Sequence, residues 1–246
     1  MIWLLGDFDL LSVFLRALTL GLELLTLGGV AYLLIVVMPV GAGESVTGGC
    51  RRGIRWAATS FAIVELCYIA VDSAILMANS SLTIGDLVGA PYFLAGACAA
   101  IAALGIVLCA RYEGHGSAYA MVCLGALVLA AVVSTSHSVS RLDHRSSLTA
   151  LTAAHQLGAA LWIGAMPFLL ISLRRAGDPV EAKRMLRRFS PLALVGAATL
   201  LLSGVGMGWV YLGISADKSL SGLYGTAYGV MMISKVYLVL DRKSVV

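Results

Sequence analysis

The sequence predicts an all-α integral membrane protein, a bundle of about seven transmembrane helices. Of its 246 residues, 60% are hydrophobic and only 12% are charged, whereas a soluble domain carries roughly a quarter charged residues. The mean hydropathy is +0.94. Each spanning helix needs about 20 apolar residues, so seven helices leave only short loops. A separate soluble domain is therefore excluded, as are a disordered chain and a nucleic-acid-binding module, which need far more charge.

Seven apolar runs account for the predicted helices, and glycine-containing breaks separate them. The breaks include Gly41 to Gly43, Gly48-Gly49, Gly85-Asp86, Gly114 to Gly116 and Gly177 to Pro179. The last run is the weakest because the chain stops soon after it. The runs lie near residues 10–39, 54–79, 91–110, 117–137, 149–173, 191–214 and 225–241.

The basic residues predict the orientation of the bundle, because short cytoplasmic loops carry an excess of Lys and Arg. The regions after the first, third and fifth helices hold ten such residues, and those after the second, fourth and sixth hold three. The N-terminus is therefore predicted outside and the C-terminus in the cytoplasm. No Lys or Arg precedes Arg16, so the N-terminal segment is not predicted to be a cleavable signal peptide. The basic segment 174–188 is either the topological anchor or a lipid- or partner-binding patch.

Three of the four histidines lie on the predicted outer side. His137 ends the fourth helix, His144 follows in the loop, and His155 lies inside the fifth helix. Imidazole binds copper, zinc and haem iron, so these are candidate metal ligands, with Met166 deeper in the fifth helix as a candidate thioether ligand. His137 and His144 could instead be solvated rim residues, and methionines are more often packing residues. An ionisable residue inside the membrane, such as His155, is by default a functional candidate.

Two further residues of the fifth helix support this site. Trp162 lies seven residues after His155 and shares its face of the helix, and Gly158 lies on the same side. A small residue there admits a neighbouring helix or a ligand. The alternative is a tight helix–helix seam with an interfacial tryptophan, and the two interpretations are compatible.

Four charged residues are predicted inside the membrane: Glu23, Glu65, Asp72 and Lys235. A charge at the bilayer centre costs about 2.5–3.5 kcal/mol, so such side chains should face the interior of the bundle and pair. One interpretation is a set of internal ion pairs, such as Lys235 with Glu23 or Glu65. The other is a cation or proton path that starts from Asp72 near the outer rim.

An ordered series of motifs runs through the last third of the chain. The fifth helix contains HQLGAALWIGAMPFLL (His155 to Leu170), and the basic segment ends in Arg187-Arg-Phe-Ser-Pro191. Leu202-Ser-Gly204 follows in the sixth helix, and a Thr-x-Tyr-Gly motif with Tyr228 precedes Lys235. In order and spacing this series resembles the copper resistance protein D (CopD) family of bacterial membrane proteins.

The resemblance implies copper handling at the bacterial inner membrane, either uptake from the periplasm or delivery to a copper enzyme. Copper would be the bound ion, and a periplasmic copper-binding protein and the lipid bilayer would be the partners. It divides the chain into an N-terminal region of four helices, 1–140, and a CopD-like region of three helices, 141–246. Family members usually continue through another helix after the lysine, so the end at Val246 predicts a shortened protein.

Two other functions remain open. In a b-type cytochrome, His137 and His155 would ligate one haem b axially, with Gly158 making room for the macrocycle. An assembly subunit would have no ligand of its own. We expect no enzymatic activity, because the hydrolase, metalloprotease, Walker and Rossmann motifs are absent from the sequence. The five cysteines form no CxxC pair, which argues against a zinc module or a disulfide framework.

Overall fold

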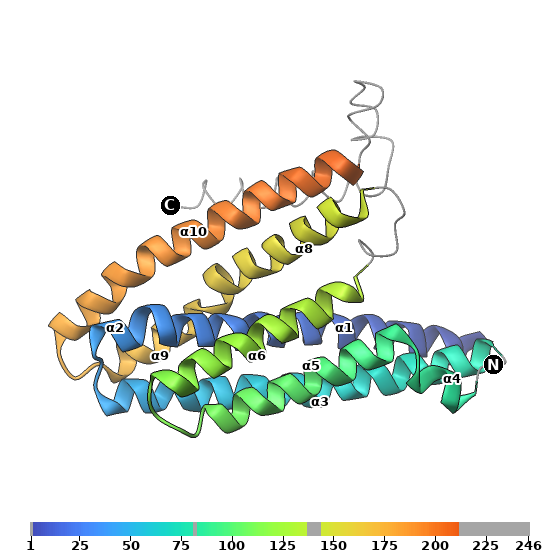
Figure 1. The fold of residues 1–246 in the computed structure, drawn as a ribbon, viewed down its shortest axis with the longest axis horizontal. Helices are drawn as coiled ribbons and strands as arrows, with labels where there is room; N and C mark the ends of the chain where they lie inside the picture. The colour runs from blue at the N-terminus through green and yellow to red at the C-terminus, as the bar shows by residue number, and fades with distance from the viewer. Residues whose placement is uncertain (1, 81–82, 137–143, 212–246) are drawn as a thin grey trace.

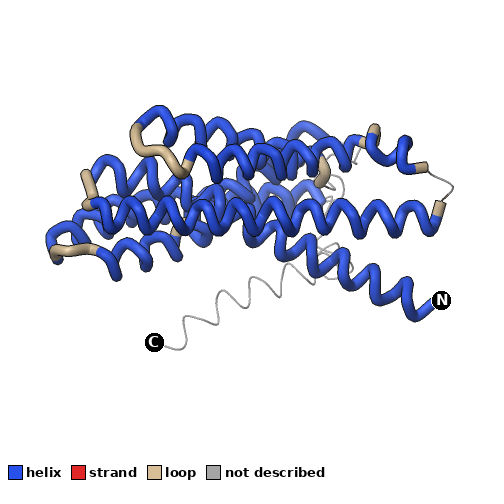
Figure 2. Tube along the Cα trace, turned by 90° about the horizontal axis from the view of Figure 1, so that it is seen from below, coloured by secondary structure: helices blue, strands red, loops and turns tan. Residues whose placement is uncertain are grey.

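The computed structural model of the protein describes residues 2–80, 83–136 and 144–211. These ranges are helical apart from short connections, and no strand occurs in them (Figure 2). The helical segments are α1 (Ile2–Tyr32), η1 (Leu33–Val37), α2 (Met38–Val40), α3 (Glu44–Asn79), α4 (Ile84–Val88), α5 (Pro91–Cys109), α6 (His115–Ser134), α8 (Arg145–Ala159), η2 (Ala160–Gly164), α9 (Met166–Arg175) and α10 (Pro179–Tyr211).

Six helices in the described ranges are long and apolar enough to cross a membrane, and this length and composition identify a multi-pass membrane protein. Large apolar side chains point outward from them, including Trp56 and Leu194, each 71% exposed. The predicted seventh span, 225–241, lies outside the described residues. The six spans are Leu10–Val40, Glu44–Asn79, Pro91–Cys109, His115–Ser134, Arg145–Arg175 and Pro179–Val210.

Two predicted boundaries are wrong. The second spanning helix begins at Glu44 rather than near residue 54, and Gly48-Gly49 lies within it instead of breaking it. Gly49 is a packing position: a Cβ atom there would come within 2.7 Å of Arg175 Cδ. The sixth spanning helix begins at Pro179 rather than near residue 191, so most of the basic segment is helical. Both helices extend beyond their apolar runs because backbone hydrogen bonding continues where hydropathy falls.

Two of the spanning helices contain a π-helical segment, and a proline follows each segment closely. Pro39 follows η1, and Pro167 follows η2. A proline has no backbone N–H, and its ring clashes with the carbonyl four residues earlier. Widening the preceding turn relieves that clash while the helix continues, and such segments often occur at functional sites.

Four of the helices form one group, and two further helices form a hairpin that packs against this group (Figure 1). Successive members of the group, α1, α3, α5 and α6, pack side by side, and α8 and α10 pack against each other as the hairpin. The η2 segment packs against α1 and connects the two parts. Fully buried side chains fill the core of the group, including Ile54, Phe61, Ile106 and Met121. In Figure 1 the hairpin diverges from α6 toward the start of α8.

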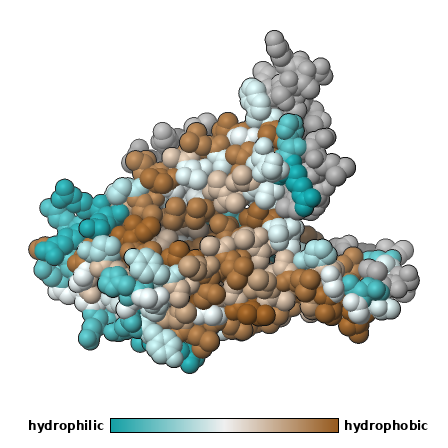
Figure 3. Space-filling view, viewed as in Figure 1, coloured by the Kyte–Doolittle hydropathy of each residue, from teal (hydrophilic) through white to brown (hydrophobic). Residues whose placement is uncertain are grey.

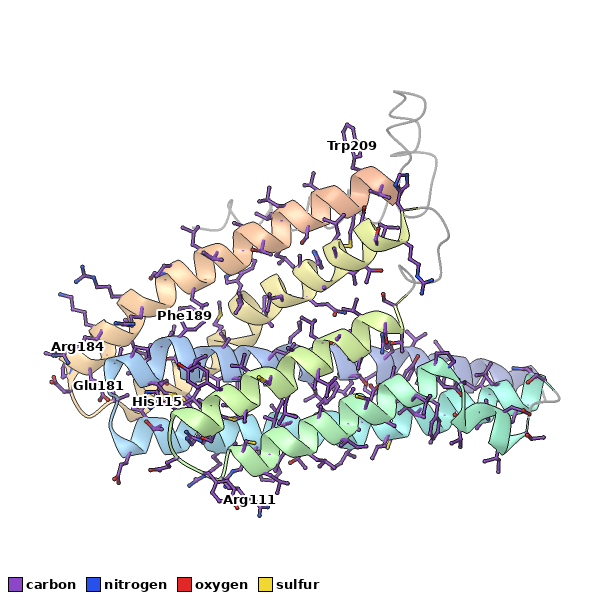
Figure 4. All side chains as sticks on the ribbon, viewed as in Figure 1. Arg111, His115, Glu181, Arg184, Phe189 and Trp209 are labelled. Atoms are coloured by element: carbon purple, nitrogen blue, oxygen red, sulfur yellow. The ribbon has the colours of Figure 1, made fainter. Side chains whose placement is uncertain are left out.

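The two ends of the bundle differ in charge. Hydrophilic residues gather at the end that contains α2 and the α9–α10 connection (Figure 3). Arg111, His115, Glu181 and Arg184 lie at this end (Figure 4), which we call the basic rim. The Glu181 carboxylate accepts a hydrogen bond from the backbone N–H of Gly43 at 2.8 Å, so the α9–α10 connection is tied to the start of α3. The opposite rim contains α4, the start of α8 and the end of α10 (Figure 1).

Candidate functional site

His155 lies in α8 and points at α10. Its Nδ1 atom is 3.1 Å from the backbone oxygen of Leu200 and 3.2 Å from the Ser203 Oγ. The side chain is partly buried in the half of the bundle toward the opposite rim. The fifth spanning helix therefore holds this imidazole against the sixth, inside the apolar part of the protein.

The hydrogen bonds around His155 identify Nδ1 as a ring nitrogen that donates. The Ser203 hydroxyl donates to backbone carbonyl oxygens of its own helix, at 2.6 Å to Thr199 and at 3.1 Å to Leu200. The Leu200 carbonyl oxygen beside His155 Nδ1 can only accept, so Nδ1 carries a proton. A histidine whose second ring nitrogen donates to a carbonyl in this way has the usual arrangement of a metal ligand.

Among the described residues, Met207 places its sulfur in this part of the hairpin. The Met207 Sδ atom is 3.7 Å from the Thr152 Oγ1, and Thr152 lies one turn from His155 on the same side of α8. Met166 is 43% exposed and follows the η2 segment, whose wider turns rotate the helix face. A regular helix would place Met166 on the His155 side, and the η2 segment lies between the two residues.

The other two outer histidines are not brought to His155 in the described residues. His144 is exposed and precedes α8 in the left-handed conformation, with φ 56°. It lies eleven residues before His155, which is about 16 Å along a helix axis. It lines an open cleft of about 1010 Å³ between α6 and α8. His137 lies outside the described residues. No group of three or more His, Cys, Asp or Glu side chains suited to a metal occurs in the part of the chain that is described.

Gly158 is a contact between helices. A Cβ atom at this position would lie 2.7 Å from the Leu200 nitrogen and 2.8 Å from the Gly196 oxygen, both in the α10 backbone. Trp162 lies one turn further along, within η2, and its backbone nitrogen packs close to the Gly196 Cα of α10. Gly158 therefore fits the interpretation as part of a tight helix–helix seam. The α10 backbone occupies the space beside Gly158 in which the b-type cytochrome alternative would place a haem macrocycle.

The intramembrane acids lie on the other side of the molecule, between α1 and α3. Glu23 is fully buried, and Glu65 is 3% exposed. Both Glu23 carboxylate oxygens and the Glu65 Oε2 have no hydrogen-bond partner among the described residues. Asp72 is partly buried nearer the opposite rim and accepts a hydrogen bond from Ser12. Lys235, the predicted partner of these acids, lies outside the described residues, as does Tyr228 of the Thr-x-Tyr-Gly motif.

Three residues that take part in these two regions had no role assigned from the sequence alone. Ser203 and Met207 lie on α10 four residues apart, and Thr19 lies on α1 beside Glu65. Only the four-residue spacing on α10 could have indicated a shared face. The pairing of each residue with a partner on another helix depends on the register between helices, which no single segment contains.

One comparison with known proteins gave a match. The family model of copper resistance protein D, CopD, matches residues 183–240, which confirms the resemblance and supports assignment to that family over this segment. The match covers less than a quarter of the chain and includes Ser203 and Met207 but not His155. No curated protein and no solved structure matches the chain.

Proposed function

Because residues 183–240 match the copper resistance protein D family, we propose that this membrane protein transports or delivers copper through a site between α8 and α10. The observation that carries the proposal is the orientation of His155. Its Nδ1 lies 3.1 Å from the Leu200 carbonyl oxygen and 3.2 Å from the Ser203 Oγ, which fixes the ring against α10, as hydrogen bonds of this kind orient the histidines of metal sites. The coarser conclusion, a membrane protein related to copper resistance, rests on the family match and the six apolar helices.

The chemistry of the neighbouring donors suits copper. Imidazole nitrogen and thioether sulfur both bind copper, and sulfur favours the softer Cu(I). Met207 places a thioether on α10 about one turn from the level of His155. His137 remains a predicted additional ligand from the fourth helix. We infer that His155 and Met207 are the first ligands that a copper ion meets within the hairpin.

The distribution of charge supports the predicted orientation. Arg111, Arg184 and the other residues of the basic rim would face the cytoplasm, because cytoplasmic ends carry the excess of Lys and Arg. His155 then lies toward the outer face, which is the periplasmic face in a bacterial inner membrane. A site in this position would receive copper from a periplasmic copper-binding protein.

The test is copper binding by purified protein, with paired variants that separate the site from the rest of the molecule. We expect His155→Ala to lose most of the bound copper and Met207→Leu to lose part of it. His115→Ala at the basic rim and Met77→Leu on the exposed surface of α3 are the matched controls and should bind like the parent protein. Full copper retention by His155→Ala would contradict the proposed site.

An optical spectrum of the same preparation tests the two alternatives. A b-type haem would give reduced-minus-oxidised bands that the copper proposal does not. A protein that retains neither copper nor haem but copurifies with a partner would favour the assembly subunit.

A further inference from the structure

A stripe of polar residues runs along one face of α1 in the half that begins at the opposite rim. Its members are spaced by three or four residues, which places them on a single face of the helix. The stripe is unusual because the rest of this segment is apolar. Its members are Ser12, Arg16, Thr19 and Glu23.

Each member of the stripe except the last has a partner on α3. The Ser12 hydroxyl donates to Asp72 at 3.3 Å. The Arg16 guanidinium lies over the Tyr68 ring, 5.4 Å from its centroid. Thr19 is beside the Glu65 carboxylate. Because residue numbers rise along α1 and fall along α3 in these pairs, the helices are antiparallel and the contacts form successive polar steps from the rim inward.

The stripe ends at Glu23. Its side chain has no exposed surface, and neither of its oxygens has a hydrogen-bond partner among the described residues. Thr26, one turn further, donates its hydroxyl to the Leu22 carbonyl and does not serve Glu23. Leu27 and Val30, buried at 8% and 4% exposure, continue the helix beyond it. The polar steps therefore lead from the rim to two buried carboxylates, Glu65 and Glu23, and stop.

The charged groups around the two carboxylates are few. Arg16 is the one cationic side chain in the described ranges that acts on both, and each carboxylate is also within range of the other. Further out, α3 contributes Tyr68 and Asp72, and α5 contributes Tyr92.

The other described elements packed against α1 place no further charged group beside the two carboxylates. The η1 and η2 segments contain no titratable residue, and His155 of α8 lies against α10. The other titratable residues of these elements are exposed, namely His115, Tyr119 and Cys123 of α6, Arg174 and Arg175 of α9, and Arg145 of α8. One guanidinium can balance one of two buried carboxylates, so the other is favoured as the neutral acid.

We propose that Glu23 and Glu65 form a proton-binding site inside the membrane, loaded from the opposite rim past Asp72. In the binding step a proton from outside water joins a carboxylate oxygen and forms an O–H bond, and the site loses one negative charge. Release reverses the step. The hydroxyl groups of Ser12, Tyr68 and Thr19 line the route and can pass a proton between donors and acceptors.

The position of Arg16 favours a proton over a metal cation. Its guanidinium lies over Tyr68, between the level of Asp72 and that of Glu65. A metal ion would have to pass this positive charge with its hydration shell removed, whereas a proton can move by exchange along hydroxyl groups. The proposal does not depend on copper binding, because it uses neither His155 nor Met207.

The first test is labelling with N,N′-dicyclohexylcarbodiimide, a reagent for protonated carboxyl groups in apolar surroundings, followed by mass spectrometry of the full chain. We expect label on Glu23 or Glu65 in acidic buffer, its loss as the pH is raised, and loss of the site's label in the Glu23→Gln, Glu65→Gln double variant. Glu44 and Glu113, exposed at the basic rim, are the controls and should stay unlabelled. An unlabelled pair, or a label independent of pH, would overturn the proposal. Protection by Na⁺ or Cu⁺ in acidic buffer would overturn it in favour of a metal-cation site.

A second measurement uses the parent protein, so it does not depend on whether a variant folds. The infrared spectrum of the parent protein should contain a carboxylic acid C=O band that disappears at high pH and shifts in D₂O. If the isosteric Glu23→Gln variant folds, it should lose or displace this band. A spectrum with no protonated carboxyl band at any pH would refute the proposal even if copper binding by His155 were confirmed.

Discussion

The α8–α10 and α1–α3 interfaces both bring polar groups into the apolar bundle, but they differ in how those groups are satisfied. At α8–α10 the glycines Gly158 and Gly196 let the two backbones touch, and His155 is held by hydrogen bonds to both a carbonyl and a hydroxyl. At α1–α3 the polar groups meet through their side chains, and Glu23 has no hydrogen-bond partner among the described residues.

This difference separates two kinds of function. A close seam with satisfied hydrogen bonds fixes one ring orientation, which a metal ligand requires. An interface with unpartnered buried acids has groups that are stabilised by changing their protonation state. We therefore expect variants of the seam to change copper binding and stability, and variants of the polar stripe to change proton binding with little effect on copper.

The largest expected effect comes from adding a methyl group to the α8–α10 contact. In Gly158→Ala the new methyl group meets the α10 backbone at 2.7 and 2.8 Å, and backbone atoms cannot rotate away as a side chain can. Overpacking costs about 1–3 kcal/mol, and we expect a loss near the upper end in the free energy of unfolding, measured by denaturant titration in detergent.

The matched control for this variant is Gly48→Ala in α3. A Cβ atom there meets nothing within 4 Å, so alanine should leave stability unchanged or raise it by up to about 1 kcal/mol through helix propensity. Equal stability of the two variants would show that the α8–α10 contact is not as close as described.

The second effect is on the orientation of His155. Ser203→Ala removes one of the two acceptors of its Nδ1–H and keeps the Leu200 carbonyl. Loss of such a supporting contact costs about 10–100-fold in metal affinity, and we expect the lower end, because one acceptor remains. Copper titration of purified protein measures it. Ser190→Ala is the control, since Ser190 donates only to the Leu186 carbonyl of its own helix, and its affinity should match that of the parent protein.

The two interfaces also differ in what the sequence could predict. Hydropathy located the six described spans, and an imidazole in an apolar run drew attention to His155. Hydropathy placed the start of α3 too late, because charged and glycine residues after Glu44 lower the hydropathy of turns that are still helical. The prediction of Met166 as a ligand assumed a regular helix and could not include η2, and the sequence could not show that Met207 of α10 contacts Thr152 of α8. Contacts such as Arg16 over Tyr68 depend on the register between helices, which is a tertiary property.

A third prediction concerns the hydroxyl beside Glu65. Thr19 and Thr26 are both fully buried, and both donate to the carbonyl four residues earlier, but only Thr19 also approaches a carboxylate, that of Glu65, closely enough for a side-chain hydrogen bond. Thr19→Val should cost about 1 kcal/mol of stability and shift the infrared band of the buried carboxylic acid. Thr26→Val is the control and should leave the band in place. A shift of equal size in both variants would argue that Thr19 acts only on its own helix.

The smallest expected effect tests whether Arg16 is held by the face of the Tyr68 ring. Phenylalanine at this position keeps the aromatic face, so Tyr68→Phe should retain the contact that lies 5.4 Å from the centroid. Leucine removes it, and a cation–π contact at a partly exposed site contributes about 0.5–1 kcal/mol. We therefore expect Tyr68→Leu to be less stable than Tyr68→Phe by that amount in the same detergent titration. Because the guanidinium then loses its fixed place between Asp72 and Glu65, Tyr68→Leu should also change the pH at which the infrared acid band disappears. If the two variants agree in both measurements, the ring does not position Arg16, and the argument that its charge excludes metal cations from the stripe loses its structural basis.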